Sequence, residues 1–361
     1  MGLKCGVVGL PNVGKSTLFN SLTGAGAEAA NFPFCTIEPN VGVVPVADER
    51  LEKIESIVRP KKTVPAFIEF VDIAGLVKGA SEGKGRGNAF LSHIREVDLI
   101  AHVVRCFEDG DITHVDGSVS PARDIETIET ELILKDIETL EKREQKLSSQ
   151  SKSGDKEIRK HLSEVEELRR FIEEGNLARA HPDCAEINAE QQLFLLTAKP
   201  FLYVCNVADG EADSEFSREV ESHAAKMSAP AVKVCARIEE EISTLDPEER
   251  EEFLQEMGIE TTGLQKLVKA AYDGLGLITY FTAGPKEAKA WTIKRGTKAP
   301  QAAGVIHTDF EKGFIRAETI KYEDFVAAGS EASAREAGKM RSEGKDYEVC
   351  DGDIMLFRFN V

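Results

Sequence analysis

Glycine, lysine and serine residues near the start of the chain have the spacing of a phosphate-binding loop. The run Gly9-Leu10-Pro11-Asn12-Val13-Gly14-Lys15-Ser16 fits the pattern G-x-x-x-x-G-K-[ST] at every fixed position. Glycines let the backbone wrap a phosphate, and N–H groups at a helix start point toward its oxygens. Lys15 can reach the β- and γ-phosphates, and the Ser16 hydroxyl can ligate magnesium. We therefore expect these residues to bind nucleotide phosphates: Asn12, Val13, Gly14, Lys15, Ser16 and Thr17.

A second motif, Asp72-Ile73-Ala74-Gly75, follows a later apolar run. A carboxylate at a strand end opposite a phosphate loop can hold magnesium, usually through water, and the Gly75 N–H can approach a γ-phosphate. Between the two motifs lies the segment 31–40, whose prolines exclude a helix interior. Thr36 is the only hydroxyl residue in it, so we expect Thr36 to join Ser16 and Asp72 at magnesium. The alternative is a plain surface loop.

Two short segments near 206 and 235 are candidates for recognising the base of the nucleotide. Asn206-Val207-Ala208-Asp209 ends the fifth apolar run, and Cys235-Ala236-Arg237 ends the sixth. In a parallel sheet the carboxyl ends of strands share one edge with the phosphate loop. We therefore expect the base to contact Asn206, Val207, Asp209, Cys235 and Ala236.

The order of apolar runs predicts an α/β fold with a mainly parallel sheet. These runs are 3–8, 41–46, 66–71, 99–105, 201–205 and 231–235. From Asp124 apolar residues recur at helical spacing among charges, pause at 148–154 and resume to about 172, which predicts an antiparallel helical hairpin with a narrow seam. Two helices lying on the sheet are the alternative. From Ile278 short strands, one near Tyr347–Val349, surround a helix near Ala302–Phe310 and indicate a small α+β module.

We accordingly expect a nucleotide-binding domain formed by residues 1–123 and 193–277, an inserted hairpin at 124–192, and a final module at 278–361. The net charge of −18 argues against avid non-specific binding to nucleic acid, including bulk DNA. Acidic and basic residues balance from 278 onward, so the acidic excess lies before that point. The seven cysteines form no paired spacing, and no signal peptide or membrane segment is recognisable. We expect a cytoplasmic protein with no membrane association.

With these motifs in order, the chain resembles the YchF/Obg-like ATPase family of P-loop GTPases over nearly its whole length. The matching segments are Gly9–Ser16, Asn31–Asn40, Asp72–Gly85, Gly344–Tyr347, Asp351–Asp353 and Phe357–Val361. The resemblance implies a nucleotide-binding domain, an inserted helical hairpin and a C-terminal ubiquitin-like TGS module. It also implies hydrolysis of ATP in preference to GTP and association with the ribosome.

The base motif departs from the pattern of typical GTPases, which is Asn-Lys-x-Asp. Val207 replaces the lysine, so part of the guanine clamp is absent and adenine becomes plausible. Asp209 remains, where the family more usually has glutamate, and this keeps guanine binding open. Arg237 and Arg86 also depart from the family pattern, but neither change touches the phosphate chemistry.

Two further residues are candidates for the hydrolysis step. Leu76 occupies the position where many relatives hold a water-orienting glutamine, and leucine cannot orient water, so intrinsic turnover should be slow. His114, in the loop 108–116, could position or deprotonate the water if that loop folds inward; a solvated histidine is the alternative. In related proteins an asparagine at the position of Asn12 helps to hold potassium, whereas here it could simply stabilise the turn.

These observations favour a magnesium-dependent ATPase switch that docks on the ribosome through the hairpin, the glycine-rich loop 75–88 and the C-terminal module. We expect the partner to be the large subunit, including its rRNA. One alternative is a GTP-specific switch of the same fold. Another is a phosphotransferase acting on a metabolite, for which the sequence contains no acid/base constellation.

Overall fold

The computed structural model describes residues 3–25, 40–73, 86–115, 117–152 and 155–360. Their contacts divide the chain into two compact units. The first unit comprises Met1–Val44 and Glu69–Gly274, and the second comprises Pro45–Ile68 and Leu275–Val361. The chain therefore passes between the units within two strands, β2 and β4, and again after residue 274.

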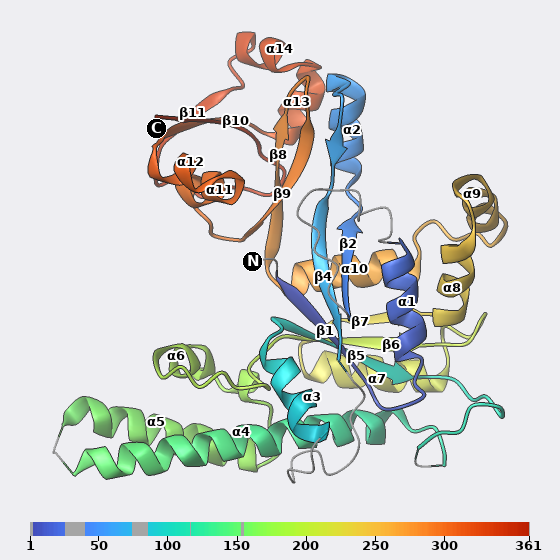
Figure 1. Ribbon diagram of the computed structural model, residues 1–361, viewed down its shortest axis with the longest axis vertical. Coiled ribbons are helices and arrows are strands. Elements are labelled where there is room, and N and C mark those ends of the chain that lie inside the picture. The colour runs from blue at the N-terminus through green and yellow to red at the C-terminus, as the bar shows by residue number, and fades with distance from the viewer. Residues whose placement is uncertain (1–2, 26–39, 74–85, 116, 153–154, 361) are drawn as a thin grey trace. The chain divides into compact units, whose positions relative to one another are not determined.

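A six-stranded sheet of order β2-β4-β1-β5-β6-β7 organises the first unit (Figure 1). Its strands are β1 (Lys4–Val8), β2 (Val41–Val46), β4 (Ala66–Asp72), β5 (Leu99–Arg105), β6 (Phe201–Asn206) and β7 (Ala231–Val234). β1 pairs in parallel with both β4 and β5, and β6 pairs in parallel with β5 and β7. All residues of β5 and β6 are buried, as continuous apolar runs predict for central parallel strands. The expected α/β class is thus confirmed.

Helices α1, α3, α7, α8, α9 and α10 complete this unit around the sheet (Figure 1). Their bounds are α1 (Lys15–Ala25), α3 (Arg86–Arg95), α7 (Glu215–Lys226), α8 (Ala236–Thr244), α9 (Pro247–Glu256) and α10 (Gly263–Gly274). Two of them, α1 and α8, begin directly at the phosphate-loop and base motifs. The predicted site residues therefore lie at the carboxyl ends of the strands, where these two helices begin.

The helical insertion forms a hairpin of α4 (Pro121–Ser151) and α5 (Lys156–Glu173), followed by the short α6 (Cys184–Glu190). Figure 1 shows α4 and α5 side by side, extending away from the sheet of the first unit. The seam is apolar and includes the buried residues Leu140, Leu147, Val165, Leu168 and Ile172. α4 begins at Pro121, earlier than the apolar periodicity indicated, because proline suits the first helical position. No helix among the described residues is long and apolar enough to cross a membrane.

Buried carboxylates hold α4 against the rest of the first unit. Asp136 accepts hydrogen bonds from the backbone N–H groups of Leu196 (2.7 Å) and Thr197 (2.8 Å). Burial raises the pKa of the Asp136 carboxyl to about 6, against these hydrogen bonds, which favour its charged form. Glu129 lies about two turns before Asp136 in α4 and accepts a hydrogen bond from the hydroxyl of Tyr203 on β6. These contacts fix the base of the hairpin to the central sheet.

The second unit contains a mixed sheet of order β11-β10-β12-β8-β9-β3. β12 pairs antiparallel with β10 and parallel with β8. The core of this unit includes Tyr280, Met355 and Phe357. Its elements from 277 onward are β8 (Leu277–Ala283), β9 (Ala288–Lys294), α11 (Ala299–Ile306), α12 (Thr308–Lys312), β10 (Phe314–Ile320), α13 (Tyr322–Ala328), α14 (Glu331–Glu336), β11 (Arg341–Glu343) and β12 (Ile354–Phe359).

Two local predictions in this unit were wrong. The strand expected near Tyr347–Val349 lies instead at Arg341–Glu343, where β11 pairs with β10. Residues 347–349 form one antiparallel β-bridge, between Glu348 and Lys298, but no strand. Val349 is buried and Tyr347 packs against the same core. The helix expected over 302–310 is split into α11 and α12, because His307 is extended and caps the second helix through its side chain.

Residues 45–68 are part of the second unit, whereas the sequence prediction placed them in the nucleotide-binding domain. This segment contains α2 (Glu49–Val58) and β3 (Thr63–Val64), and β3 pairs in parallel with β9. The guanidinium of Arg50 lies 2.8 Å from the carboxylate of Asp351 and packs over the ring of Phe281. Strand pairing and a partly buried ion pair over 300 residues apart in sequence thus decide where this segment belongs.

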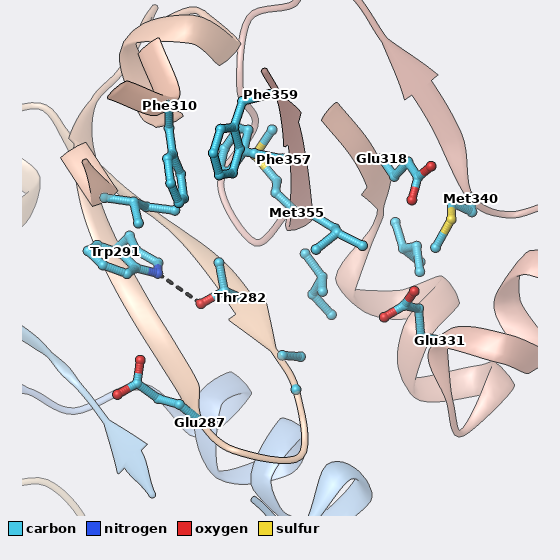
Figure 2. Close-up of a pocket in the computed structure, with 16 residues that line it drawn as sticks. Thr282, Glu287, Trp291, Phe310, Glu318, Glu331, Met340, Met355, Phe357 and Phe359 are labelled. Carbon is cyan, nitrogen blue, oxygen red and sulfur yellow. Dashed lines mark hydrogen bonds between the residues drawn. The ribbon is translucent and has the colours of Figure 1, made fainter. Parts of the chain in front are cut away.

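The second unit also contains a cavity of about 390 Å³. Figure 2 shows aromatic and methionine side chains along it, with Trp291 donating a hydrogen bond to Thr282 (2.9 Å). The rings of Phe310 and Phe359 stack with centroids 3.8 Å apart beside it. None of the residues predicted to bind nucleotide lines this cavity.

Candidate nucleotide-binding site

The backbone of the phosphate loop is held in conformations that turn it between β1 and α1. Asn12 and Gly14 both have positive φ, of 62° and 89°. The Gly14 carbonyl accepts the N–H of Leu18 (3.0 Å), which starts the hydrogen-bonding ladder of α1. Val13 is buried, whereas Ser16 is exposed at the start of the helix. Free N–H groups at such a helix start are a binding site for phosphate oxygens.

Asn206 joins the phosphate loop to the predicted base motif. Its Nδ2 donates to the Val13 carbonyl (2.8 Å), and its Oδ1 accepts the N–H of Ala236 (3.1 Å). A Cβ atom on Gly14 would lie 2.1 Å from that same Nδ2. Position 14 therefore needs glycine for two reasons: its φ is positive, and the Asn206 amide leaves no room for a Cβ atom.

Lys15 and Asp72 meet across the end of the sheet. Asp72 ends β4 beside β1, with Val7 as its register partner, and its carboxylate accepts a hydrogen bond from the Lys15 ammonium. The Ser16 hydroxyl and the Asp72 carboxylate supply the hard oxygen donors that Mg²⁺ prefers, so this donor set fits the ion. Thr36 and Gly75, the other residues predicted here, lie outside the described residues.

The predicted base residues lie at the ends of β6 and β7. Val207 is buried and donates its backbone N–H to Val234 (3.0 Å), while Asp209 is exposed. Burial raises the pKa of the Cys235 thiol, and the nearby carboxylate of Asp209 acts in the same direction. The structure thus brings Cys235 and Asp209 close enough to interact. Position 207, where typical GTPases have lysine, is a valine.

Arg105 organises the loop that follows β5, and the sequence analysis did not single it out. The guanidinium is buried and donates to the carbonyls of Phe107 (3.1 Å), Ile112 (3.0 Å) and Asp109 (3.3 Å). Three carbonyl acceptors satisfy a buried cation and fold the loop around it. The available signal was a single charged residue at the end of an otherwise apolar strand.

His114 lies in this loop and is buried rather than solvated. Its side chain is 3% exposed, and its Nε2 is 2.9 Å from Oδ2 of Asp124, a residue in the first turns of α4. The neighbouring residue Thr113 accepts a hydrogen bond through its carbonyl from Asn12 Nδ2 (3.1 Å). Asn12 therefore links the phosphate loop to the His114 loop, which is more than the local turn contact considered from the sequence. No local pattern of residues pointed to Asp124 as the partner of His114.

The parallel sheet, the phosphate loop and the opposed Lys15 and Asp72 define the class of protein: a P-loop nucleotide-binding domain of the GTPase type. Family models agree with this assignment. Residues 4–164 match the family described as 50S ribosome-binding GTPase. Residues 277–360 match the C-terminal domain of YchF GTPases, described as a protein of unknown function (DUF933).

Comparison with individual proteins gives the family. The chain is 55% identical to "Ribosome-binding ATPase YchF" of Bacillus subtilis and 56% identical to that of Escherichia coli O157:H7, with all of each chain covered. The solved structure of the Schizosaccharomyces pombe YchF GTPase superposes with a TM-score of 0.90 at 38% identity, covering 99% of this chain and 98% of that one. This chain belongs to the YchF family.

The geometry around Gly14 leads to a test. We expect Gly14→Ala to lower nucleotide affinity about 100-fold, because strain at positive φ and displacement of Asn206 together cost roughly 3 kcal/mol. Titration with a fluorescent nucleotide analogue measures this. Gly24→Ala, in the helix α1 that follows the loop, is the control, since its Cβ would make only ordinary contacts with Ser243. Equal affinities for the two variants would contradict the role given to Gly14.

Proposed function

We propose that this protein is a cytoplasmic, ribosome-associated switch that binds ATP in preference to GTP and hydrolyses it to ADP and phosphate. The observation that carries the ATP preference is Val207, a buried apolar residue where a guanine-binding site needs the aliphatic stem and ammonium of a lysine. The names of the bacterial relatives, which describe ribosome-binding ATPases, support the same reading. The fission yeast relative is named a GTPase, so the base preference needs its own test.

Phosphate binding falls to Asn12, Val13, Gly14, Lys15, Ser16, Thr17 and Gly75, as the sequence predicts. Ser16, Thr36 and Asp72 would hold Mg²⁺ directly or through water. When bound, the ion neutralises charge on the β- and γ-phosphate oxygens. When the nucleotide and its magnesium ion bind, Lys15 would leave Asp72 and contact the phosphates, and Asp72 would turn to the ion. Asn206, Val207, Asp209, Cys235 and Ala236 would contact the base.

In hydrolysis a water oxygen bonds to the γ-phosphorus while the bond from that phosphorus to the β–γ bridging oxygen breaks, and ADP leaves with the electron pair. We assign His114 to orient this water and accept its proton, which then passes to solvent. Two contacts support this role. Asn12 connects the His114 loop to the phosphate loop, and Asp124 hydrogen-bonds the imidazole. Leu76 cannot perform the task, so turnover without a partner should be slow.

Base preference is tested by titrating nucleotide-free protein with ATP and GTP in the presence of magnesium. We expect ATP to bind more tightly, and Val207→Lys to raise the affinity for GTP relative to ATP about tenfold by restoring a guanine contact worth about 1.4 kcal/mol. Val207→Met, which stays apolar, is the matched control. Tighter binding of GTP by the unaltered protein would mean that Asp209 governs recognition, and the GTP-specific alternative would hold.

We propose that Asn12 helps to hold a potassium ion that neutralises charge in the transition state. Its Nδ2 is engaged with Thr113, so Oδ1 is the atom that would face the cation. We expect single-turnover hydrolysis to be about tenfold faster in potassium than in sodium buffer, and Asn12→Ala to abolish the difference. Equal rates of the unaltered protein in the two buffers would contradict this use of Asn12.

For the ribosome, we propose contact with the large subunit, partly through rRNA. A cationic patch in the second unit supports an RNA contact. The side chains of Arg316, Arg335 and Arg358 are each about half exposed, and all three contact the carboxylate of Glu318. The hydrogen bond from Arg358 holds the pKa of Glu318 below its usual range. Glu331 also lies 3.4 Å from Arg335, so three guanidinium groups face two carboxylates and the patch keeps a net positive charge.

We expect the double variant Arg335→Gln/Arg358→Gln to co-sediment with purified large ribosomal subunits about tenfold less tightly than the unaltered protein, because it loses two phosphate contacts. Binding to small subunits should be weak for both proteins. Arg237→Gln, which removes an 85% exposed arginine side chain from the first unit, is the control. Binding of the double variant equal to that of the control would exclude this patch from the ribosomal contact.

A further inference from the structure

Strand β12 is paired along only part of its length on the side that faces β8. On its other side it pairs antiparallel with β10 from Ile354 to Phe359. Toward β8 the register contains Ile354 opposite Phe281, and the N–H of Phe281 donates to the carbonyl of Asp353 (2.8 Å). In the part of the second unit that the structure describes, no strand continues this ladder beyond Ile354. Residues Leu356–Phe359 therefore form an open edge within the sheet.

The direction of the backbone groups shows which residues of β12 can pair at this edge. Along a strand, the N–H and C=O groups of alternate residues point to opposite sides. The carbonyl of Asp353 points toward β8, whereas the N–H of Asn360 points the other way and donates to the carbonyl of Gly313 (2.9 Å). The N–H and C=O groups of Phe357 and Phe359 are therefore directed toward the open side.

The hairpin of β8 and β9 leaves this edge because its far side is held elsewhere. The N–H of Gly284 closes the hairpin by donating to the carbonyl of Glu287 (3.0 Å), and the carbonyl of Pro285 accepts the N–H of Lys61 (3.2 Å). β3 then pairs with the start of β9, on the side away from β12. The side chain of Glu287 lines the cavity at the hairpin tip, where it interacts with Lys289.

The cavity of the second unit occupies the space between the hairpin and the open edge (Figure 2). Residues 282–284 line it from the hairpin, and residues 354–357 and Phe359 line it from β12. Side chains alternate between the two faces of a strand, so Phe357 and Phe359 share one face. Phe357 belongs to the aromatic core of the unit, and Phe359 stacks on Phe310. A side chain that enters the cavity on this face meets aromatic surface, which favours an apolar or aromatic group.

The opposite face of β12 carries an exposed apolar side chain and a cation. Leu356 is 38% exposed, and Arg358, two residues further along, contacts the carboxylate of Glu318 on β10 (2.9 Å). Two other arginines contact the same carboxylate, and the carboxylate of Glu331 contacts one of them. Three guanidinium groups thus face two carboxylates. A side chain placed beside Arg358 meets a net positive charge, which favours a carboxylate.

We propose that the open edge binds an extended segment of a partner protein as an added strand. Backbone hydrogen bonds to Phe357 and Phe359 hold the segment, and its side chains give specificity. Directly opposed residues of two paired strands share a face. The residues of the segment beside the two phenylalanines are therefore apolar or aromatic, and the residue between them, beside Arg358, is acidic. The partner is recognised by an apolar–acidic–apolar sequence in an extended conformation.

This inference goes beyond the proposed ATPase switch. It shares Arg358 with the proposed RNA contact, so it is tested on the full-length protein without ribosomes. The protein is titrated with a fluorescein-labelled heptapeptide whose central residues are Phe-Asp-Phe, and binding is followed by fluorescence anisotropy. The comparison peptides have Phe-Lys-Phe or Ser-Asp-Ser at the centre, or carry N-methyl groups on the three central residues. We expect each change to weaken binding at least about tenfold, because each removes the charge match, the aromatic contact or the strand hydrogen bonds.

Charge reversal on the protein tests the face that carries Arg358. We expect Arg358→Glu to weaken binding of the Phe-Asp-Phe peptide about tenfold and to bind the Phe-Lys-Phe peptide in its place. Lys345→Glu makes the same change of charge at an exposed position of the same unit, away from the open edge, and should bind as the unaltered protein does. If Arg358→Glu fails to fold, Arg358→Gln is used and should lose the preference for aspartate over lysine.

A second readout reports on the backbone of the open edge. In protein labelled with ¹⁵N-phenylalanine, the amide signal of Phe359 is identified by its loss in Phe359→Leu. At saturating Phe-Asp-Phe peptide this amide proton should exchange more slowly with solvent, because it donates to the added strand. Binding without this protection would place the peptide elsewhere and overturn the inference.

The other outcomes are equally decisive. Absence of binding by the Phe-Asp-Phe peptide would overturn the proposal. Equal binding of all the peptides would show a cavity that accepts apolar groups without adding a strand, and would overturn it as well. Sedimentation of the unaltered protein as a dimer that the peptide does not dissociate would assign the open edge to a second copy of this chain instead.

Discussion

The amide of Asn206 ties together the separate chain segments that make up the nucleotide site. It contacts the carbonyl of Val13 and the N–H of Ala236, while its own backbone carbonyl accepts the N–H of Cys106 at the end of β5. Both donor and acceptor of one buried side chain are thereby satisfied, as burial of an amide requires. Asn206 therefore connects the phosphate loop, the base motif and the central sheet through hydrogen bonds. Glycine at position 14 leaves room for its side-chain amide.

α4 joins the hairpin to the rest of the first unit. Three buried carboxylates on α4 each contact a different part of the first unit: Asp124 contacts the His114 loop, Glu129 contacts β6, and Asp136 contacts the segment that leads into β6. Buried charges are tolerated only with such partners. Hydrogen bonds thus join the near end of the hairpin to the rest of the first unit. In its distal half the two helices are held together by an apolar seam.

The second unit has a different physical character. Its core is aromatic, with Tyr280 between Trp291 and Phe357. Its surface carries three arginines around Glu318, and one of them, Arg335, also contacts Glu331. The acidic excess of the chain lies before residue 278, whereas acidic and basic residues balance from 278 onward.

Much of this organisation could be predicted from the amino-acid sequence alone. The phosphate loop, Asp72 and the base motif were recognisable because their chemistry requires particular residue types at fixed local spacing. The central strands β5 and β6 were recognisable because strands buried on both faces are continuously apolar. The helical hairpin followed from periodicity, and the family followed from the order of the motifs. All of these are local signals.

Contacts between residues far apart in the chain were decided only by the tertiary structure. Residues 45–68 join the second unit through β3. Tyr347 and Val349 pack against the core of that unit, and their segment makes a single β-bridge instead of a strand. Arg105 and Asp124 looked like ordinary charged residues, and only folding brings one to three carbonyls and the other to His114. Local spacing specifies which groups can do chemistry, but burial and long-range pairing determine which of them meet.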